Sequence, residues 1–435
     1  MLAQDAYTAT DQMDYLVNTY LYYGYLPPAS TPASLHEVQS PEPMPSFSTH
    51  EATHLFNRVV DDTLLDHYTK SGRCIVPLSG GWDSRILFGA AMDRFPKDKI
   101  TTLSFGAPGQ LDYKIGKKIA KHYGVAHYAV DLTLHEISWE KLQSSITEAP
   151  WTYTPDAYFN NLAINTVAPG QNDIILSGFM GDALTGGHFT NKKGLDAEKD
   201  FFVRKQRKVK KRWLPRSTYC PYKSLPDISE TSPLPTSEQL DICIRQSSCI
   251  SSIVTPCKSL QSWSPHIGKL RASSTPVVTP FTHPEWASYW LHAPAQAKKN
   301  QNLYLSMLKQ LYPELASLPS KCSLGAPRNS HLRIRIARSK RNVRRHLGKR
   351  LPMLGIKENS GINYLDYDYA FRKRHDYRKV LKKAVKMLSK NNIATWIDHE
   401  KLMDNHDTHK EDNAKIFLLI IGLALNLENE GLIEK

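Results

Sequence analysis

Residues 76 to 85 read Val-Pro-Leu-Ser-Gly-Gly-Trp-Asp-Ser-Arg and decide the fold. The apolar run Ile75 to Leu78 predicts a buried strand, and the amphipathic stretch from Arg85 to Phe95 predicts a helix. Between them, two glycines let the backbone approach a ligand, and the N–H groups at the helix start favour an anion. The segment therefore predicts a phosphate site. It lacks the Gly-Lys-Ser/Thr ending of kinase-like phosphate loops, which excludes that class.

The polar side chains of this loop suit a nucleotide. Ser79 and Ser84 offer hydroxyl donors, and Asp83 can hold a magnesium ion against phosphate oxygens. The pattern Ser-Gly-Gly-x-Asp-Ser resembles the pyrophosphate loop (PP-loop) of the ATP pyrophosphatases, which split ATP between its α and β phosphates. The alternative is an ordinary glycine turn between a strand and a helix. Because six positions match in the expected context, we favour the PP-loop.

Strand and helix patterns alternate beyond the loop. Three further strands are predicted at Ile100–Gly106, Ala126–Val130 and Asp173–Ser177, and a helix is predicted from Asp112 onward. This alternation over residues 51–190 is typical of a doubly wound α/β fold with a parallel sheet. Ligands of such folds bind beyond the carboxyl ends of the strands, where the glycine-rich loop at 79–84 and the segment that follows the strand ending at Ser177 are expected.

Two further helices are predicted, one before the first strand and one near the end of the sequence. Ser48 and Glu51 form a capping-box pattern at the start of a helix with one apolar face, made of Leu55, Phe56, Val59, Val60 and Leu64. The apolar run Ile416 to Leu427 is too short to span a bilayer, because spanning takes about 20 residues. It predicts a buried helix.

Two later segments narrow the resemblance. Residues 177 to 188 read Ser-Gly-Phe-Met-Gly-Asp-Ala-Leu-Thr-Gly-Gly-His, which resembles the second signature of the synthetase domain of asparagine synthetases. The stretch from Thr279-Pro280-Phe281 to Gly325 resembles the C-terminal block of that domain, with Lys321 at the family's catalytic lysine. With three motifs in order, the chain is identified as a member of this family. The resemblance implies a doubly wound PP-loop (adenine nucleotide alpha hydrolase-like) fold with a mostly helical C-terminal part.

The resemblance also implies the site. ATP and pyrophosphate would contact Leu78, Ser79, Gly80, Gly81, Asp83, Ser84, Phe105, Ser177 and Gly178. Asp83 and Asp182 would hold magnesium, and Asp182 and Lys321 would be catalytic, with Lys321 stabilising the oxyanion or the pyrophosphate. Residues 104–106 and Asp112 stand where the family has its adenine-side strand and a fixed acid. His188 is a weaker candidate for a substrate contact.

Two positions depart from the family pattern. Phe179 stands where asparagine synthetases have Glu and the related β-lactam-forming synthetases have Tyr, and Ala183 replaces a second acid. Phenylalanine neither takes a proton nor hydrogen-bonds an incoming amine. These changes predict a carboxylate substrate other than aspartate. The alternative is impaired acyl transfer, which we favour less because the residues on the nucleotide side are intact.

The amino terminus differs as well. The family's glutaminase domain begins with a nucleophilic cysteine, whereas this sequence begins Met1-Leu2 and has its first cysteine at Cys74. Residues 12–28 resemble the segment that follows the glutaminase domain. We therefore expect a synthetase half that takes ammonia or an amine from elsewhere, including a separate glutaminase subunit.

Composition indicates a cytoplasmic enzyme. The 435 residues are 41% apolar, and the six cysteines show no zinc-type spacing. No signal peptide is recognised. We expect residues 1–50 to be the remnant of an inter-domain segment with a Pro/Ser-rich linker. Residues 51–330 would form the ATP-binding domain and residues 331–435 a basic, mostly helical extension.

Charge is the most ambiguous feature. The net charge is +14, with basic clusters at 204–212, 333–350 and 372–386. Solvated helix faces are the simplest interpretation. Among binding interpretations, anionic sugar nucleotides or lipid-linked sugars at a membrane surface fit best. Nucleic acid is not expected, because interleaved aromatic residues are sparse and no RNA-binding signature is found.

Together these patterns predict an amide-forming ligase of the asparagine synthase type. It would adenylate a carboxylate with ATP and Mg²⁺ and transfer ammonia or an amine, releasing AMP and pyrophosphate. A sugar acid of surface-polysaccharide biosynthesis is the favoured substrate. One alternative is macrolactam or peptide-bond formation. The other is a nucleotide-binding regulatory or scaffold protein whose acyl-transfer chemistry has decayed.

Overall fold

The computed structural model describes residues 13–14, 16–18, 20–21, 45–65, 72–148, 154–187, 275–326, 331–350 and 365–434. The predictions for most of the Pro/Ser-rich linker, for the basic cluster at 204–212 and for His188 lie outside these residues. Within them, Cys74 is a buried free thiol and Cys322 an exposed one. Burial raises the pKa of the Cys74 thiol, so this cysteine is an unreactive part of the core.

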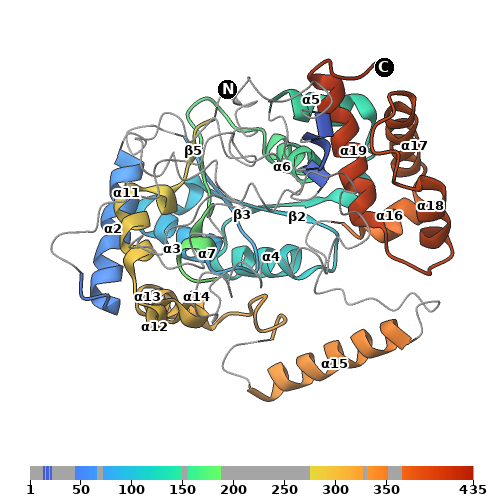
Figure 1. Ribbon diagram of the computed structural model, residues 1–435. Helices are drawn as coiled ribbons and strands as arrows, with labels where there is room; N and C mark the ends of the chain where they lie inside the picture. Colours follow the sequence, from blue (N-terminus) through green and yellow to red (C-terminus); the bar gives the residue numbers. More distant parts are fainter. Residues whose placement is uncertain are drawn as a thin grey trace.

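Five parallel strands form one sheet in the order β3-β2-β1-β4-β5 (Figure 1). The strands are β1 (Cys74–Pro77), β2 (Ile100–Gly106), β3 (Ala126–Asp131), β4 (Ile174–Leu176) and β5 (Val277–Val278). The first four confirm the predicted strands to within one residue at each end. The sequence did not predict β5, because two residues are too few to show a period. Strands β2 and β3 are added on one side of β1, and the chain then returns to add β4 and β5 on the other side. The order in which strands are added therefore reverses between β1 and β4, which is the topological switch point of the sheet.

Helices cover both faces of the sheet (Figure 1). The first face packs on α2 (Thr49–Leu64), α3 (Asp83–Arg94), α4 (Leu111–Tyr123), α11 (Pro284–His292), α13 (Asn302–Leu311) and α14 (Pro313–Ser317). Along β1, Cys74 and Val76 join this core, whereas Ile75 joins the opposite one. This alternation follows from the two-residue period of a strand, and both faces are apolar because both are covered.

The second face packs on α5 (Trp139–Glu148), α6 (Thr154–Val167) and the C-terminal helices α16 (Tyr367–Lys373), α17 (His375–Lys390), α18 (His399–Asp407) and α19 (Ala414–Asn429). Helix α19 is buried from Ile416 to Leu427, which confirms the buried helix predicted there. It contacts α5, α6 and α17. The described helices also include the short helices α7 (Gly181–Leu184) and α12 (Ala295–Lys298) and the basic helix α15 (His331–Arg350). None of the described helices combines the length and apolarity needed to cross a membrane.

The start of α2 confirms part of the predicted capping box. The Ser48 hydroxyl accepts a hydrogen bond from Glu51 N–H at 3.2 Å, which satisfies one donor of the first turn. The Glu51 carboxylate accepts from the Ser46 hydroxyl at 2.6 Å. All five apolar residues predicted for one face of α2 are buried. Local sequence thus determines both the start of this helix and the face that it buries.

Candidate functional site

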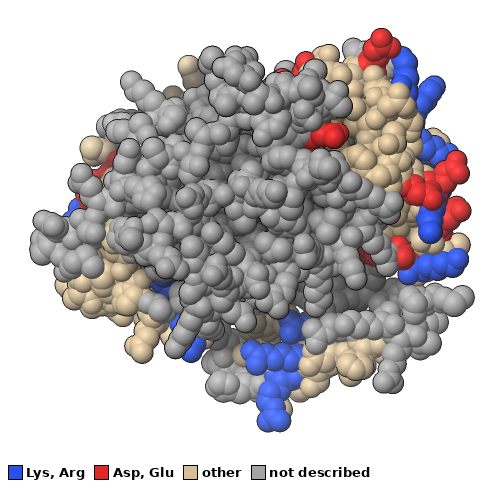
Figure 2. All heavy atoms as spheres, in the orientation of Figure 1, with Lys and Arg blue, Asp and Glu red and all other residues tan. Residues whose placement is uncertain are grey.

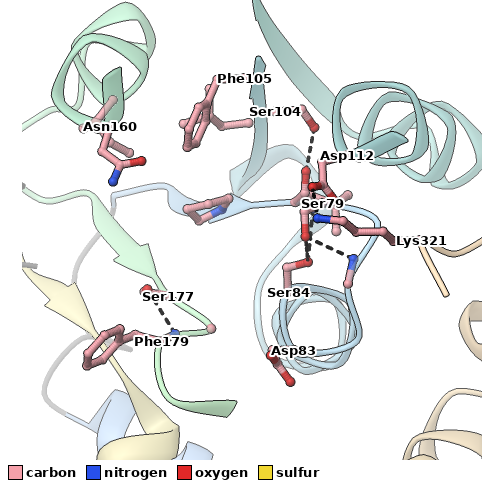
Figure 3. Close-up of a pocket in the computed structure, with 16 residues that line it drawn as sticks. Ser79, Asp83, Ser84, Ser104, Phe105, Asp112, Asn160, Ser177, Phe179 and Lys321 are labelled. Atoms are coloured by element: carbon pink, nitrogen blue, oxygen red, sulfur yellow. Dashed lines mark hydrogen bonds and ion pairs between the residues drawn. The ribbon is translucent and has the colours of Figure 1, made fainter. Parts of the chain in front are cut away.

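A cavity of about 400 Å³ lies beyond the carboxyl ends of the strands, at the topological switch point between β1 and β4 (Figure 3). Its lining comprises Pro77, Leu78, Ser79, Gly81, Asp83, Ser84, Leu103, Ser104, Phe105, Asp112, Asn160, Ile164, Ser177, Gly178, Phe179 and Lys321. Most of the predicted site residues are therefore together. The predicted Gly80 and Asp182 are not among these lining residues of the described chain. A volume of this size suits a small-molecule site.

The PP-loop is held in shape by its own serines. Ser79 N–H donates to the Ser84 hydroxyl oxygen at 3.1 Å, and the two hydroxyl oxygens lie 3.0 Å apart. Gly81 N–H donates to the Ser79 hydroxyl oxygen at 3.1 Å. Helix α3 begins at Asp83, directly after the loop. The two serines and the first turn of α3 therefore form one preorganised group at the positive end of a helix dipole.

The second glycine-rich segment packs directly on this group. A Cβ atom on Gly181 would lie 2.5 Å from Asp83 Cγ, and one on Gly178 would lie 3.1 Å from Asp83 Cβ. Between them, Met180 adopts a left-handed backbone with φ of 70°. These glycines are thus required for the close approach of the β4–α7 loop to the start of α3, and the two signatures form one site.

Lys321 reaches the site through the acid at the start of α4. Its Nζ lies 2.7 Å from Asp112 Oδ2, while Asp112 Oδ1 accepts from Gly80 N–H at 3.0 Å. Lys321 N–H also donates to Gly80 O at 2.9 Å. The N–H of Gly80 is therefore directed to Asp112. The predicted family lysine lies beside the PP-loop although it is more than 200 residues away in sequence.

Arg85 is a site-building residue that the sequence did not single out. It is completely buried, and its guanidinium donates to the carbonyl oxygens of Leu315 (2.8 Å), Leu318 (3.1 Å) and Pro319 (2.6 Å). The same group lies 4.9 Å from the centre of the Trp82 ring. Arg85 thereby connects the start of α3 to the segment that leads into Lys321. A basic residue among buried positions of α3 was the only local signal.

Comparison with protein families agrees with this geometry. The family model described as asparagine synthase matches residues 55–322, which is more than half of the chain. The chain belongs to the asparagine synthase family. The match spans a synthetase domain and contains all the site residues named above. Members of this family are ATP-dependent carbon–nitrogen ligases. A search of curated proteins finds no match to this chain.

Within this asparagine synthase fold, two carboxylates and a tyrosine lie together beside the PP-loop. Burial, together with the charges of Asp83 and Asp182, raises the pKa of Tyr304 well above its usual value. The Tyr304 hydroxyl therefore stays protonated over the physiological range. Asp182 is exposed at the start of α7, whereas Asp83 lines the cavity. Two carboxylates at the edge of a phosphate site suit Mg²⁺, which prefers oxygen ligands. Tyr304 was missed because only the fold brings it here.

The wall opposite the PP-loop is largely apolar (Figure 3). It carries Phe105 from β2, Ile164 and Asn160 from α6, and Phe179 from the β4–α7 loop. Phe179 thus lies in the cavity at the position where the sequence departs from the asparagine synthase pattern. The second departure, Ala183, lies in α7, and its side chain is outside the described part of the structure.

Proposed function

We propose that this chain is an ATP-dependent ligase that adenylates a carboxylate and transfers its acyl group to ammonia or an amine. The observation that supports this most is the single cavity shared by the PP-loop, the β4–α7 loop and Lys321. Here the residues of two glycine-rich signatures face one space with an apolar wall, which offers room for a second substrate beside the nucleotide.

In the proposed reaction the PP-loop holds ATP with its α-phosphate near Ser79 and Ser84. Mg²⁺ held by Asp83 and Asp182 would neutralise phosphate charge as pyrophosphate leaves. A carboxylate oxygen of the substrate attacks the α-phosphorus, the α–β phosphoanhydride bond breaks, and pyrophosphate departs. The Lys321 ammonium, fixed by Asp112, stabilises negative charge on the departing pyrophosphate.

The second half-reaction forms the amide. The nitrogen of ammonia or an amine attacks the acyl carbon of the mixed anhydride, and AMP leaves with the bonding electron pair. The nitrogen loses its proton to solvent or to the departing phosphate. The Phe179 side chain cannot assist this transfer, because it can neither donate nor accept a proton. We infer that the nitrogen arrives already as a free amine or as ammonia from a separate glutaminase.

The cavity wall favours a carboxylate other than aspartate. Aspartate carries a second carboxylate and an ammonium group, and both would need polar partners. Phe179 instead presents an aromatic surface, and Asn160 adds one amide. An aromatic ring with an amide suits the apolar face and the hydroxyls of a sugar ring. A sugar acid of a cytoplasmic surface-polysaccharide route is therefore the substrate that we propose.

Hydroxylamine trapping tests this proposal without knowledge of the natural nitrogen donor. The purified chain is incubated with ATP, Mg²⁺, hydroxylamine and one carboxylate at a time, drawn from aspartate, uronic acids and sugar-nucleotide acids. We expect a hydroxamate from a sugar acid and none from aspartate, with Asp83→Ala as the inactive control. A hydroxamate from aspartate would overturn the substrate. ATP binding without any hydroxamate would favour a nucleotide-binding protein with decayed chemistry.

A further inference from the structure

Helix α15 combines strong positive charge with exposed apolar side chains. Its 20 residues include nine Lys or Arg and no Asp or Glu. Four of its apolar side chains are exposed: Leu332 (69%), Ile336 (47%), Val343 (56%) and Leu347 (39%). Figure 1 shows α15 along the lower edge of the molecule, apart from the layers around the sheet. The ligase chemistry uses none of these residues.

The four apolar side chains form a single stripe. At about 100° per residue, they fall within an arc of about 60° on the helix surface. Among the side chains of α15 that the structure describes, those of Ile334, Ala337 and Arg341 are partly buried, and they lie on the opposite side of the helix. The stripe therefore faces away from the partly buried side of α15.

Basic side chains flank the stripe on both sides. Helical spacing puts Arg333, Lys340 and Arg344 along one flank and Arg335 along the other. Figure 2 shows Lys and Arg side chains beside uncharged ones in the region of α15. Long basic side chains can extend from an apolar surface to reach charged groups at its border. This is the arrangement of a helix that lies in the interface of a membrane.

We infer that α15 binds the surface of an anionic lipid bilayer, with the stripe in the acyl boundary and the flanking Arg and Lys at lipid phosphates. A bilayer is the occupant that offers an apolar layer bordered by negative charge along about 30 Å of helix. A second copy of α15 would bring nine further positive charges against the first nine. RNA offers phosphates without an apolar layer, and α15 has no Phe, Tyr or Trp side chain on which bases could stack.

This binding is independent of the carboxylate that the enzyme uses. Helix α15 begins ten residues after Lys321, so a membrane-bound α15 would keep the ligase cavity near the lipid surface. A ligase held there would meet carboxylates attached to lipids at high local concentration. Membrane binding and ligase activity can be measured separately, and each can fail without the other.

Vesicle co-sedimentation of the full-length chain tests the inference. Two sets of vesicles are compared: phosphatidylcholine alone, and phosphatidylcholine with phosphatidylglycerol. We expect sedimentation only with the anionic vesicles. The variant L332S/I336S/V343S/L347S keeps every charge of α15 and should bind at least about tenfold more weakly. The variant R333Q/K340Q/R344Q keeps the stripe and should lose affinity on the order of 100-fold, because each basic residue near the surface contributes about 1 kcal/mol.

A matched control removes the same charge elsewhere. The variant K379Q/K382Q/K386Q changes three exposed lysines of α17 and should bind anionic vesicles like the unchanged chain. Pyrophosphate exchange without vesicles should be equal in all three variants, which shows that each is folded. The inference is overturned if the serine variant binds anionic vesicles as well as the unchanged chain does. It is overturned too if K379Q/K382Q/K386Q loses as much affinity as R333Q/K340Q/R344Q. It is also overturned if the chain binds RNA but not vesicles, or if the stripe holds two copies together.

Discussion

Lys321 and Asp112 form an ion pair with Nζ and Oδ2 2.7 Å apart, beside the PP-loop. Asp112 also accepts from Gly80 N–H, so one carboxylate holds both the lysine and the loop. The Lys321 side chain is 37% exposed, so solvent screens the pair and its value for stability is small. We infer that the main effect of the ion pair is to position Lys321, because it holds a flexible ammonium group next to the place where a phosphate of ATP would lie.

Loss of either partner should lower the rate of adenylation. We expect Lys321→Ala to reduce kcat of pyrophosphate exchange by about 10²–10³, as removal of one charge-stabilising donor does elsewhere. Asp112→Asn keeps an acceptor for Gly80 but loses the charge that holds Lys321, so its effect should be smaller. The effects should not add in the double variant, because Asp112 acts through Lys321. Additive losses, measured by the same exchange assay, would contradict this account.

Gly181→Ala should damage the site although it adds one methyl group. The new Cβ would lie 2.5 Å from Asp83 Cγ, so the β4–α7 loop or Asp83 must move. We expect the apparent Mg²⁺ affinity in exchange assays to fall by about tenfold or more, since about 1.4 kcal/mol corresponds to that factor. Gly170→Ala is the matched control, because its Cβ would have no neighbour within 3.5 Å. Equal behaviour of the two variants would show that the close approach is unimportant.

Arg85 should act as a positioning residue for Lys321. Arg85→Met leaves the carbonyl groups of Leu315, Leu318 and Pro319 without this donor, and each buried group left unsatisfied costs about 1–3 kcal/mol. We expect a lower melting temperature and a lower kcat with little change in KM for ATP, and partial rescue by Arg85→Lys. Arg94→Met, at the other end of α3, removes an ion pair with Asp61 and should lower stability without lowering kcat. A kcat loss as large in Arg94→Met would refute the positioning role.

Two phenylalanines of the cavity should contact different substrates, Phe105 the ATP and Phe179 the carboxylate. Phe105 lies on the predicted adenine side, so Phe105→Ala should raise KM for ATP. Phe179→Ala should raise KM for the carboxylate by about tenfold, because a buried aromatic ring contributes about 1.5–3 kcal/mol. Steady-state kinetics with each substrate varied in turn measures both effects. If both variants change only KM for ATP, Phe179 does not contact the carboxylate.

Local patterns predicted four strands of the sheet and the position of the PP-loop for a physical reason. Strands β1 and β4 are apolar runs whose residues are almost all buried, and strands buried on both faces show this signal most clearly. The PP-loop side chains are near one another in sequence, so their spacing could be recognised directly. The position of Lys321 was predicted only through the family resemblance.

Contacts over long sequence distances could not be predicted in the same way. The carbonyl groups that accept hydrogen bonds from Arg85 lie more than 200 residues away in sequence, and the residue pattern of α3 gives no sign of this contact. Tyr304 reaches the carboxylates of Asp83 and Asp182 only because α13 packs on the first face of the sheet. Strand β5 becomes visible as a strand only through its pairing with β4.

Exchange of labelled pyrophosphate into ATP is the most direct test of the central claim, which is that this cavity cleaves ATP between the α and β phosphates. We predict exchange that requires Mg²⁺ and one carboxylate of the panel, and that is lost in Asp83→Ala while the variant remains folded. Exchange of labelled phosphate, or release of ADP in place of AMP, would contradict the account.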